Sequence, residues 1–369
     1  MDKAKALLWT IRTCGLASLI VFVLVKGRNI NPRYLGISSL LQRMCPQEDW
    51  LRYGNLYGQT QIAQFKILLP DEKGPALVSA PSADADKPRV FVLGDSFMTF
   101  RRGHETYVQS LSERLHEPIH FEALKFPRPA CFRRLPKPLD KSRKQLVIME
   151  RTESGLLGMF SDVKECPSQT VEDVRSTRSL SAFVSRLFDL VFADDEQGFR
   201  AIFAFSRLTR PVAEALFTLR FSLFGAISEQ CPVYSLNPPF LFLRQETDHD
   251  LPSSFYQRHD DALIGRLADN IVKVRDALKP DANTEFVFMP VPGKYTVYHV
   301  LLNNDPYDRF LPRLCDAVER KGVRTVRLYE KFAAEPGFTF YPTDSHWTPR
   351  GNEIALDETM KVLHDLRWR

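Results

Sequence analysis

The chain has 369 residues, of which 44% are hydrophobic and 26% are charged. This composition is typical of globular proteins and excludes a mostly disordered chain or a polytopic membrane protein. The length favours one large α/β domain with insertions, or two domains. The net charge of +5, from 50 Lys and Arg against 45 Asp and Glu, is too small a bias to indicate a nucleic-acid-binding protein.

The N-terminal segment predicts a single membrane-spanning helix. Residues 6–25 are apolar except for Arg12 and a few small polar residues, and 20 residues at about 1.5 Å each match a bilayer core of about 30 Å. No small-residue cleavage site follows, so a signal anchor is favoured over a cleaved peptide. The alternative is a buried core helix. We expect residues 1–27 to be an anchor with an extracytoplasmic body, although basic residues at both ends give the orientation little support.

The body predicts alternating strands and helices after an irregular lead-in over residues 28–88. Continuous apolar runs typical of buried strands occur at 89–93 and 145–149, and further strands are expected at 119–123, 285–289 and 323–328. Helical spacing occurs at 105–115, 260–278, 310–321 and 352–366. This alternation predicts one domain over residues 89–369 with a mostly parallel sheet covered on both faces. Residues 160–258, with amphipathic segments at 171–192 and 211–224, would form a helical insertion or a subdomain.

Gly94, Asp95 and Ser96 follow the first buried strand directly. Open parallel sheets bind ligands beyond the carboxyl ends of their strands, so we expect Ser96 at the edge of a crevice. Gly94 allows a sharp exit from the strand, and a helix starting just after could aim N–H groups at developing negative charge. Taken alone, the same residues are typical of a turn or a helix N-cap.

A second polar motif, Asp344-Ser345-His346-Trp347, precedes the last predicted helix. A serine hydroxyl is a poor nucleophile until a base takes its proton, and His346 can be that base. Asp344 can hold the imidazole in the right tautomer. Side chains two apart in an extended strand stand about 7 Å apart, so the segment must turn. The alternative is a surface loop with a helix-capping Asp344 and a packing Trp347.

Together, the two motifs resemble the SGNH (GDSL-type) hydrolase superfamily, in which a Gly-Asp-Ser block follows the first strand and an Asp/His block precedes the last helix. The resemblance covers residues 89–160 and 284–366. It implies a three-layer α/β/α, flavodoxin-like fold. It also implies Ser96 as nucleophile, His346 as general base and Asp344 as the partner of the base.

The Asp-x-His spacing departs from the Asp-x-x-His usual in these hydrolases and looks like the branch of periplasmic alginate-type polysaccharide O-acetyltransferases. Residues 288–298, in which Pro-Gly-Lys is followed by Tyr, and residues 148–151, which end in Glu-Arg, are similar to segments of that branch. In that branch the Asp/His block precedes the serine, whereas here it follows. The branch resemblance implies a polysaccharide acceptor, a periplasmic location and a membrane-bound O-acyltransferase partner supplying acyl groups. With the expected anchor, this places the protein in the inner membrane with its enzymatic domain in the periplasm.

Two of the usual oxyanion-hole donors of the superfamily are missing, which leaves the N–H of the serine itself. The second block, residues 125–130, lacks its Gly, and the third block, which ends in Arg151, lacks its Asn. Arg151 or Arg128 could substitute, because a guanidinium can stabilise an oxyanion. The alternative for Arg151 is a structural ion pair. The basic segment 125–144 predicts either a solvated loop or a rim for an anionic glycan or lipid headgroups.

Three further residues are candidates for substrate binding. Trp347 could form an apolar platform for a sugar, and Lys294 and Tyr298 could line the crevice. Each of them also fits core packing. The Cys and His residues show no metal-ligand spacing, so we expect neither a metal nor a cofactor.

We therefore expect a membrane-anchored serine acyl-transfer enzyme that O-acetylates a polysaccharide through an acyl-Ser96 intermediate. An esterase with water as acceptor needs the same residues. A non-catalytic glycan-binding or assembly scaffold is a further alternative, suggested by the missing Gly and Asn. No nucleic-acid partner is expected.

Overall fold

The structure is a computed structural model. It describes residues 54–66, 88–100, 105–124, 143–161, 210–278, 283–302 and 305–368. The chain divides into two compact units, Met1–Leu68 with Thr170–Cys231, and Leu69–Gln169 with Pro232–Arg369. The domain boundaries expected from the sequence stay predictions.

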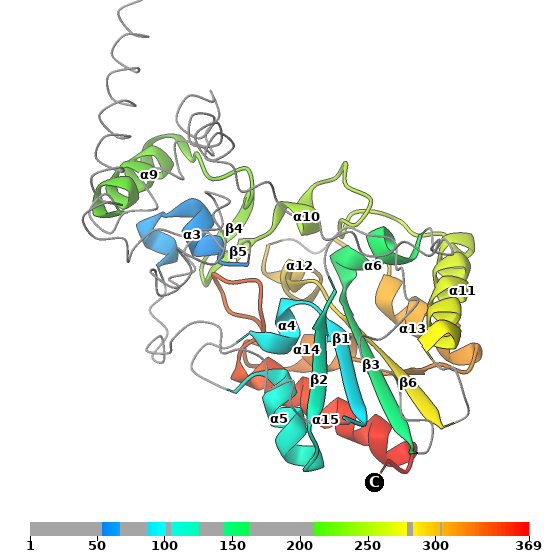
Figure 1. The fold of residues 1–369 in the computed structure, drawn as a ribbon. Helices are drawn as coiled ribbons and strands as arrows, with labels where there is room; N and C mark the ends of the chain where they lie inside the picture. Colours follow the sequence, from blue (N-terminus) through cyan, green and yellow to red (C-terminus); the bar gives the residue numbers. More distant parts are fainter. Residues whose placement is uncertain are drawn as a thin grey trace, which may run out of the picture. The chain divides into compact units, whose positions relative to one another are not determined.

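The larger unit is built on a five-stranded sheet in the order β2-β1-β3-β6-β7 (Figure 1). The strands are β1 (Val90–Gly94), β2 (Ile119–Ala123), β3 (Gln145–Thr152), β6 (Thr284–Val291) and β7 (Arg324–Thr325). All neighbouring strands are parallel. In chain order this is the 2-1-3-4-5 arrangement of doubly wound sheets, which bind ligands where the order reverses, between β1 and β3.

Helices cover both faces of this sheet, because successive side chains of a strand point to opposite faces. The helices are α5 (Tyr107–Leu115), α6 (Glu153–Phe160), α11 (Asp261–Leu278), α13 (Phe310–Arg320) and α15 (Pro349–Asp365). Val90 and Ile148 share one apolar core with residues of α5 and α15. Phe91 and Val147 share the other with residues of α6, α11 and α13. The predicted α/β class, with a parallel sheet between helical layers, is confirmed.

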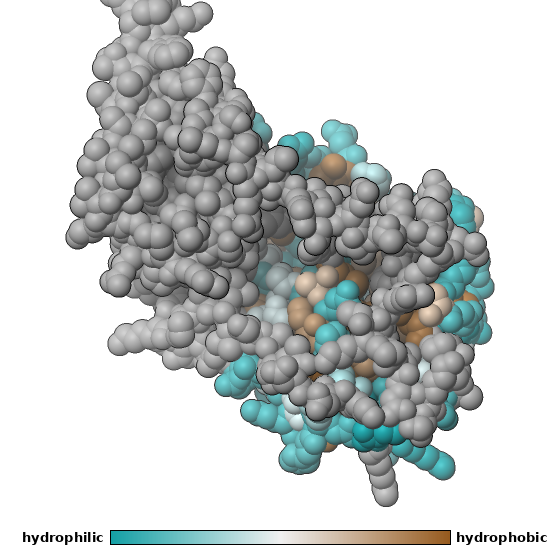
Figure 2. Space-filling view, viewed as in Figure 1, coloured by the Kyte–Doolittle hydropathy of each residue, from teal (hydrophilic) through white to brown (hydrophobic). Residues whose placement is uncertain are grey.

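Shorter elements complete the larger unit. They are α4 (Ser96–Thr99), α10 (Arg244–Thr247), α12 (Lys294–Tyr298), a 3-10 helix (His299–Leu301), α14 (Tyr329–Ala334) and an antiparallel hairpin of β4 (Val233–Leu236) and β5 (Pro239–Phe242). The hairpin was not expected from the sequence. On the side viewed in Figure 2, hydrophilic residues cover much of the described surface of this unit, and apolar residues gather in the middle.

One predicted strand is shorter than expected. Pairing over 323–328 is confined to Arg324–Thr325, followed by one hydrogen bond from the Val326 N–H to the Phe288 carbonyl (2.9 Å). Val326 and Leu328 then turn into the apolar core, and α14 begins at Tyr329. The apolar residues of this segment, Val323, Val326 and Leu328, are therefore buried in the core, although only part of the segment pairs as a strand.

The smaller unit is described over residues 54–66 and 210–231. It contains α3 (Leu56–Thr60), a 3-10 helix (Ala63–Phe65) and α9 (Arg210–Phe224). Phe65 packs edge-on against Phe221 of α9, with ring centroids 5.7 Å apart. Glu214 of α9 accepts hydrogen bonds from Lys66 (2.9 Å) and from the Tyr57 hydroxyl. The amphipathic segment expected at 211–224 is this helix.

Within the described ranges, the helices are too short or too polar to cross a bilayer. The expected anchor, residues 1–27, lies outside the described residues. So does the amphipathic segment expected at 171–192.

Candidate active site

Ser96 is the first residue of α4, directly after the central strand β1. The Asp95 carboxylate caps this short helix by accepting a hydrogen bond from the Phe97 N–H (3.0 Å). Phe97 and Met98 are buried, whereas Ser96 is exposed. The apolar residues that anchor α4 therefore leave the Ser96 hydroxyl at the surface, at the carboxyl edge of the sheet.

Glu150 supports this turn from the neighbouring strand β3. Its Oε2 accepts a hydrogen bond from the Asp95 N–H (2.8 Å). A Cβ at Gly94 would lie 2.6 Å from the same oxygen, so only glycine allows this approach. Burial of Glu150, reinforced by the nearby Asp95 carboxylate, raises the pKa of Glu150 well above its ordinary value. Burial thus shifts this carboxyl toward its protonated form beneath the turn that carries Ser96.

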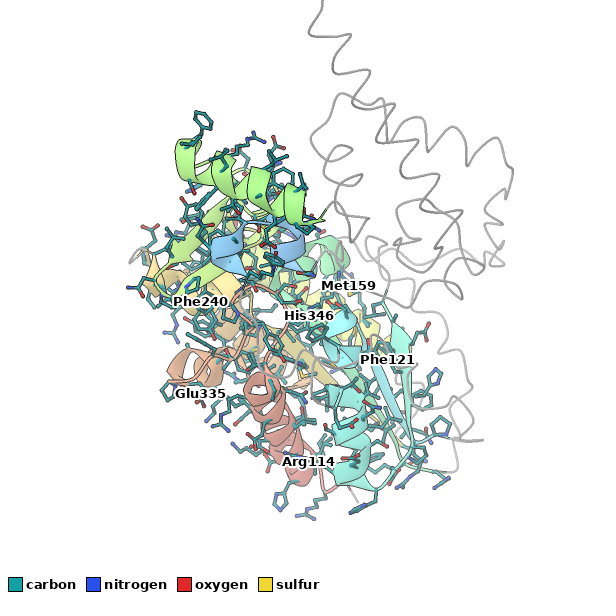
Figure 3. All side chains as sticks on the ribbon, turned by 90° about the vertical axis from the view of Figure 1, so that its left-hand side faces the viewer. Arg114, Phe121, Met159, Phe240, Glu335 and His346 are labelled. Atoms are coloured by element: carbon teal, nitrogen blue, oxygen red, sulfur yellow. The ribbon has the colours of Figure 1, made fainter. Side chains whose placement is uncertain are left out.

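His346 joins the Ser96 hydroxyl to the Asp344 carboxylate. Its Nε2 lies 2.7 Å from Ser96 Oγ, and its Nδ1 lies 2.7 Å from Asp344 Oδ1. His346 and Asp344 are 2% and 0% exposed. The structure therefore brings the three residues that the sequence singled out into one hydrogen-bonded chain from the surface to the core. In Figure 3 His346 lies toward one end of the sheet and Arg114 of α5 toward the other.

The segment from Phe340 to Trp347 makes the turn that the spacing requires. A β-bridge pairs its two ends, and the Tyr341 N–H donates to the His346 carbonyl (3.0 Å). Asp344 Oδ1 also accepts the His346 backbone N–H (3.0 Å). One carboxylate oxygen thus holds both the backbone and the ring of His346, which is how side chains two positions apart can meet.

Aromatic rings fix the imidazole of His346. Phe100 stacks on it with centroids 4.1 Å apart and an interplanar angle of 15°, and Phe97 packs at 4.8 Å. Phe97 in turn meets Trp347 edge-on at 5.2 Å. These contacts restrict rotation of the ring and shield its faces from water.

Trp347 is a core residue. It is fully buried and packs against Phe97, Tyr107 and Phe332. A side chain with no exposed face cannot present a platform to a sugar. The expectation that Trp347 contacts substrate is therefore corrected, and the packing alternative holds.

Tyr298 and Lys294 are also buried, at 8% and 1% exposed. The Tyr298 hydroxyl accepts hydrogen bonds from the N–H groups of Thr339 (2.7 Å) and Phe340 (3.2 Å). Lys294 donates to backbone carbonyls, among them that of Asp344. Both side chains bind the backbone of residues 339–344 from within the core. The expectation that they line a substrate crevice is therefore corrected as well.

Arg151 lies near the end of β3, beside the turn that carries Ser96. It is 3% exposed, and its Nη1 lies 3.8 Å from Asp95 Oδ2. The guanidinium packs closely on Gly155 of α6, where a Cβ would lie 2.3 Å from Arg151 Nε. The contact with Asp95 is an ion pair of the kind expected if Arg151 is a structural residue. The oxyanion role of Arg151 stays a prediction. Arg128 and the rest of the second block lie outside the described residues.

Two buried carboxylates that the sequence patterns do not single out fix the start of α12. Glu153 Oε2 accepts the Gly293 N–H (2.8 Å), and Glu246 accepts the N–H groups of Lys294 (3.1 Å) and Tyr295 (2.9 Å). Burial raises the pKa of Glu153, and raises that of Glu246 to about 7. The Pro-Gly before Lys294 signals the end of a strand, but nothing local indicates these distant acidic partners.

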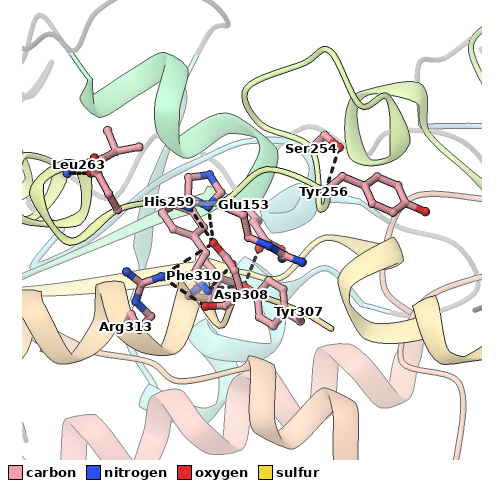
Figure 4. Close-up of polar contacts among 12 residues, drawn as sticks. Glu153, Ser254, Tyr256, His259, Leu263, Tyr307, Asp308, Phe310 and Arg313 are labelled. Atoms are coloured by element: carbon pink, nitrogen blue, oxygen red, sulfur yellow. Dashed lines mark hydrogen bonds and ion pairs between the residues drawn. The ribbon is translucent and has the colours of Figure 1, made fainter. Parts of the chain in front are cut away.

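A second histidine–aspartate pair is structural. His259 Nδ1 lies 2.8 Å from Asp308 Oδ2, which also accepts the His259 N–H, and Asp308 Oδ1 accepts the Phe310 N–H at the start of α13 (Figure 4). The pair borders a cavity of about 10 Å³ lined also by Glu153 and Tyr307, room for about one water molecule. Within the part of the chain that the structure describes, no group of three or more His, Cys, Asp or Glu residues could hold a metal ion.

Residues 238–368 match the family model described as "SGNH hydrolase-like domain, acetyltransferase AlgX". The matched part contains Lys294, Asp344 and His346, while Ser96 precedes it. The resemblance to SGNH hydrolase-like proteins of the AlgX acetyltransferase type is thereby confirmed over these residues.

No curated protein matches this chain. Among solved structures, a chain from a crystal structure aligns with 76% of this chain and 97% of its own length, at 10% sequence identity and a TM-score of 0.30. A likeness at that score carries no argument about this protein.

Proposed function

We propose that this protein is a serine O-acyltransferase that transfers an acetyl group to a polysaccharide. The observation that carries the proposal is the hydrogen-bonded chain from Ser96 Oγ through His346 to Asp344. The match of the C-terminal part to an AlgX-type acetyltransferase model gives it a reaction class.

The first half of the reaction forms an acyl-enzyme. Ser96 Oγ attacks the carbonyl carbon of the acyl donor while His346 Nε2 takes the hydroxyl proton. The tetrahedral intermediate collapses, the bond to the leaving group breaks, and His346 gives its proton to that group. Asp344 keeps Nδ1 protonated, so that Nε2 is free to accept, and stabilises the imidazolium that forms.

The second half transfers the acyl group. A sugar hydroxyl attacks the acyl-Ser96 carbonyl while His346 takes its proton, and His346 returns that proton to Ser96 Oγ as the ester bond breaks. The Ser96 N–H at the start of α4 is a candidate oxyanion donor. Arg151, next to Asp95, is a second candidate, and Arg128 remains a third.

We also propose a location and a donor route. The apolar run over residues 6–25 supports an inner-membrane anchor with the enzymatic domain in the periplasm. Transfer there needs acyl groups carried across the membrane, and a membrane-bound O-acyltransferase partner could supply them. Protease added to spheroplasts should then digest the domain, and full protection would contradict this orientation.

An esterase is the second candidate, because water can replace the sugar hydroxyl with the same residues. Purified full-length protein should be incubated with an activated acetyl ester, with and without a polysaccharide acceptor. A transferase accumulates acetylated glycan and consumes ester faster with acceptor, whereas an esterase releases acetate at a rate independent of glycan. Consumption no faster than by Ser96→Ala protein in both arms would overturn both functions and favour a non-catalytic scaffold.

A further inference from the structure

Lys294, the first residue of α12, is a buried cation with a full set of acceptors. It is 1% exposed. Its Nζ donates to the carbonyls of Leu241 (2.8 Å), Pro342 (2.5 Å) and Asp344 (3.2 Å). A protonated lysine has three N–H donors and no acceptor. Three carbonyl oxygens therefore match the charged form of Lys294.

The surroundings of Nζ also favour a charge. Nζ lies 5.0 Å from the ring centroid of Phe240 and 5.4 Å from that of Phe242, within the range of cation–π attraction. Both rings belong to β5, and the Leu241 N–H between them donates to the Pro342 carbonyl (3.0 Å). The ammonium thus joins the β4–β5 hairpin to the segment that carries Asp344.

This cation reaches the acid–base pair through a single residue. Asp344 accepts from Lys294 Nζ through its carbonyl and from His346 Nδ1 through its carboxylate. All three residues are nearly or fully buried, and charges interact strongly where water is excluded. A positive charge at Nζ therefore stabilises the Asp344 carboxylate and disfavours a second positive charge on the His346 ring.

We propose that Lys294 is a positioning residue for the acid–base pair: it holds the Asp344 backbone and, through its charge, keeps His346 unprotonated as a base. The proposal rests on the proposed function for its activity readout, but its structural part stands on the contacts of Lys294 alone.

Other charged and titratable groups face the same site. Ser96 and Asp344 contact the His346 ring, and Glu246 of α10 accepts the backbone N–H of Lys294. Asp95, next to Ser96 in the chain, lies near Arg151 of β3. Tyr298 of α12 ties residues 339 and 340 of the same segment without a charge. Tyr298 is therefore a matched control that separates holding the segment from charging it.

The test is the titration of His346 in full-length protein, followed by NMR of histidine-labelled samples and assigned with His346→Gln. Lys294→Met removes the donors and the charge, and Lys294→Gln keeps N–H donors but removes the charge. In both variants His346 should titrate at a pH higher by about half a unit or more. The reason is that the positive charge of Lys294 no longer disfavours the imidazolium form of His346. The acidic limb of the kcat/KM profile should move in the same direction.

Two controls bracket this result. Lys294→Arg keeps the charge and should leave the titration near that of the wild-type protein. Tyr298→Phe should lower the melting temperature without moving the titration. If Lys294→Met does not fold, the comparison of Lys294→Gln with Lys294→Arg still tests whether the charge at this position sets the titration of His346.

An unchanged His346 titration in the neutral variants, or an equal shift in Tyr298→Phe, would overturn the proposal. The NMR titration needs no turnover. Absence of acyl transfer by the wild-type protein would therefore overturn the proposed function and leave the test of Lys294 intact.

Discussion

Ser96 Oγ and His346 Nε2 are 2.7 Å apart, although the two residues are separated by 250 positions in the chain. Ser96 is carried by the end of β1, whose Val90 and Val92 lie in the same apolar core as Ile354 and Leu363 of α15. His346 lies in the loop just before α15, closed by the Phe340–Trp347 bridge. The contact therefore depends on how α15 packs on the sheet.

Removing either end of this contact should strongly lower turnover while leaving the fold intact. Ser96 is exposed, so Ser96→Ala removes only the hydroxyl proposed as the nucleophile. Ser96→Ala and His346→Ala should each lower kcat by about 10³-fold or more with an activated acetyl ester. Circular dichroism spectra should match those of the wild-type protein. Rates like those of the wild-type protein in either variant would contradict the assignment.

Asp344→Asn tests the tautomer of His346. The amide keeps the size of the carboxylate, and its oxygen can still accept the His346 N–H. If the amide instead turns its N–H toward Nδ1, it loses that backbone bond and moves the ring proton to the wrong nitrogen. In either orientation the charge that stabilises the imidazolium is gone, so kcat should fall by about 10³–10⁴-fold. Ser345→Ala, in the same loop, is the control and should stay within about 3-fold of wild type. A comparable loss in Ser345→Ala would mean that the loop alone explains the effect.

Much of this arrangement was predictable from the sequence. The apolar run that became β1 ends at Gly94, so a position for Ser96 at the carboxyl edge of the sheet follows from strand burial alone. The spacing of Asp344 and His346 demanded a turn, and the turn exists. These features depend on short segments whose residue types restrict the backbone strongly.

Lys294 and Trp347 show what the sequence could not reveal. A lysine is almost never fully buried, and Lys294 is buried because carbonyls from β5 and from the Asp344 segment converge on it. Trp347 directly follows His346 in the chain, yet its ring packs in the core against Tyr107. Both outcomes depend on long-range packing, which local patterns do not encode.

Gly94→Ala tests the close approach of β1 to Glu150. The added Cβ would lie 2.6 Å from Glu150 Oε2 and from Met98 Cγ, so it should lower the free energy of unfolding by about 1–3 kcal/mol and reduce kcat by displacing Ser96. Gly265→Ala in α11 is the matched control, because its Cβ meets nothing within 4 Å. That change should be neutral or stabilising by up to about 1 kcal/mol. Equal stability of the two variants in denaturant titrations would contradict this account.

Glu246 should make stability depend on pH. Burial raises its pKa from 4.5 to about 7, so the folded state favours the protonated form. The contribution of protonated Glu246 to the free energy of unfolding is fully present below about pH 4.5 and is lost as the pH rises through 7. The loss amounts to roughly 3 kcal/mol. Glu246→Gln does not titrate and should lose less stability than the wild-type protein between pH 5 and pH 8. Identical pH slopes in urea unfolding would refute this assignment.

The most direct test of the central claim is covalent labelling of the nucleophile. Full-length protein should be exposed to a serine-reactive phosphonate, digested and analysed by mass spectrometry, with His346→Ala protein as the control. The account predicts an adduct on Ser96 that forms much more slowly in the His346→Ala protein, because the base that activates the hydroxyl is missing. No adduct on Ser96, or equal labelling in the two proteins, would contradict it.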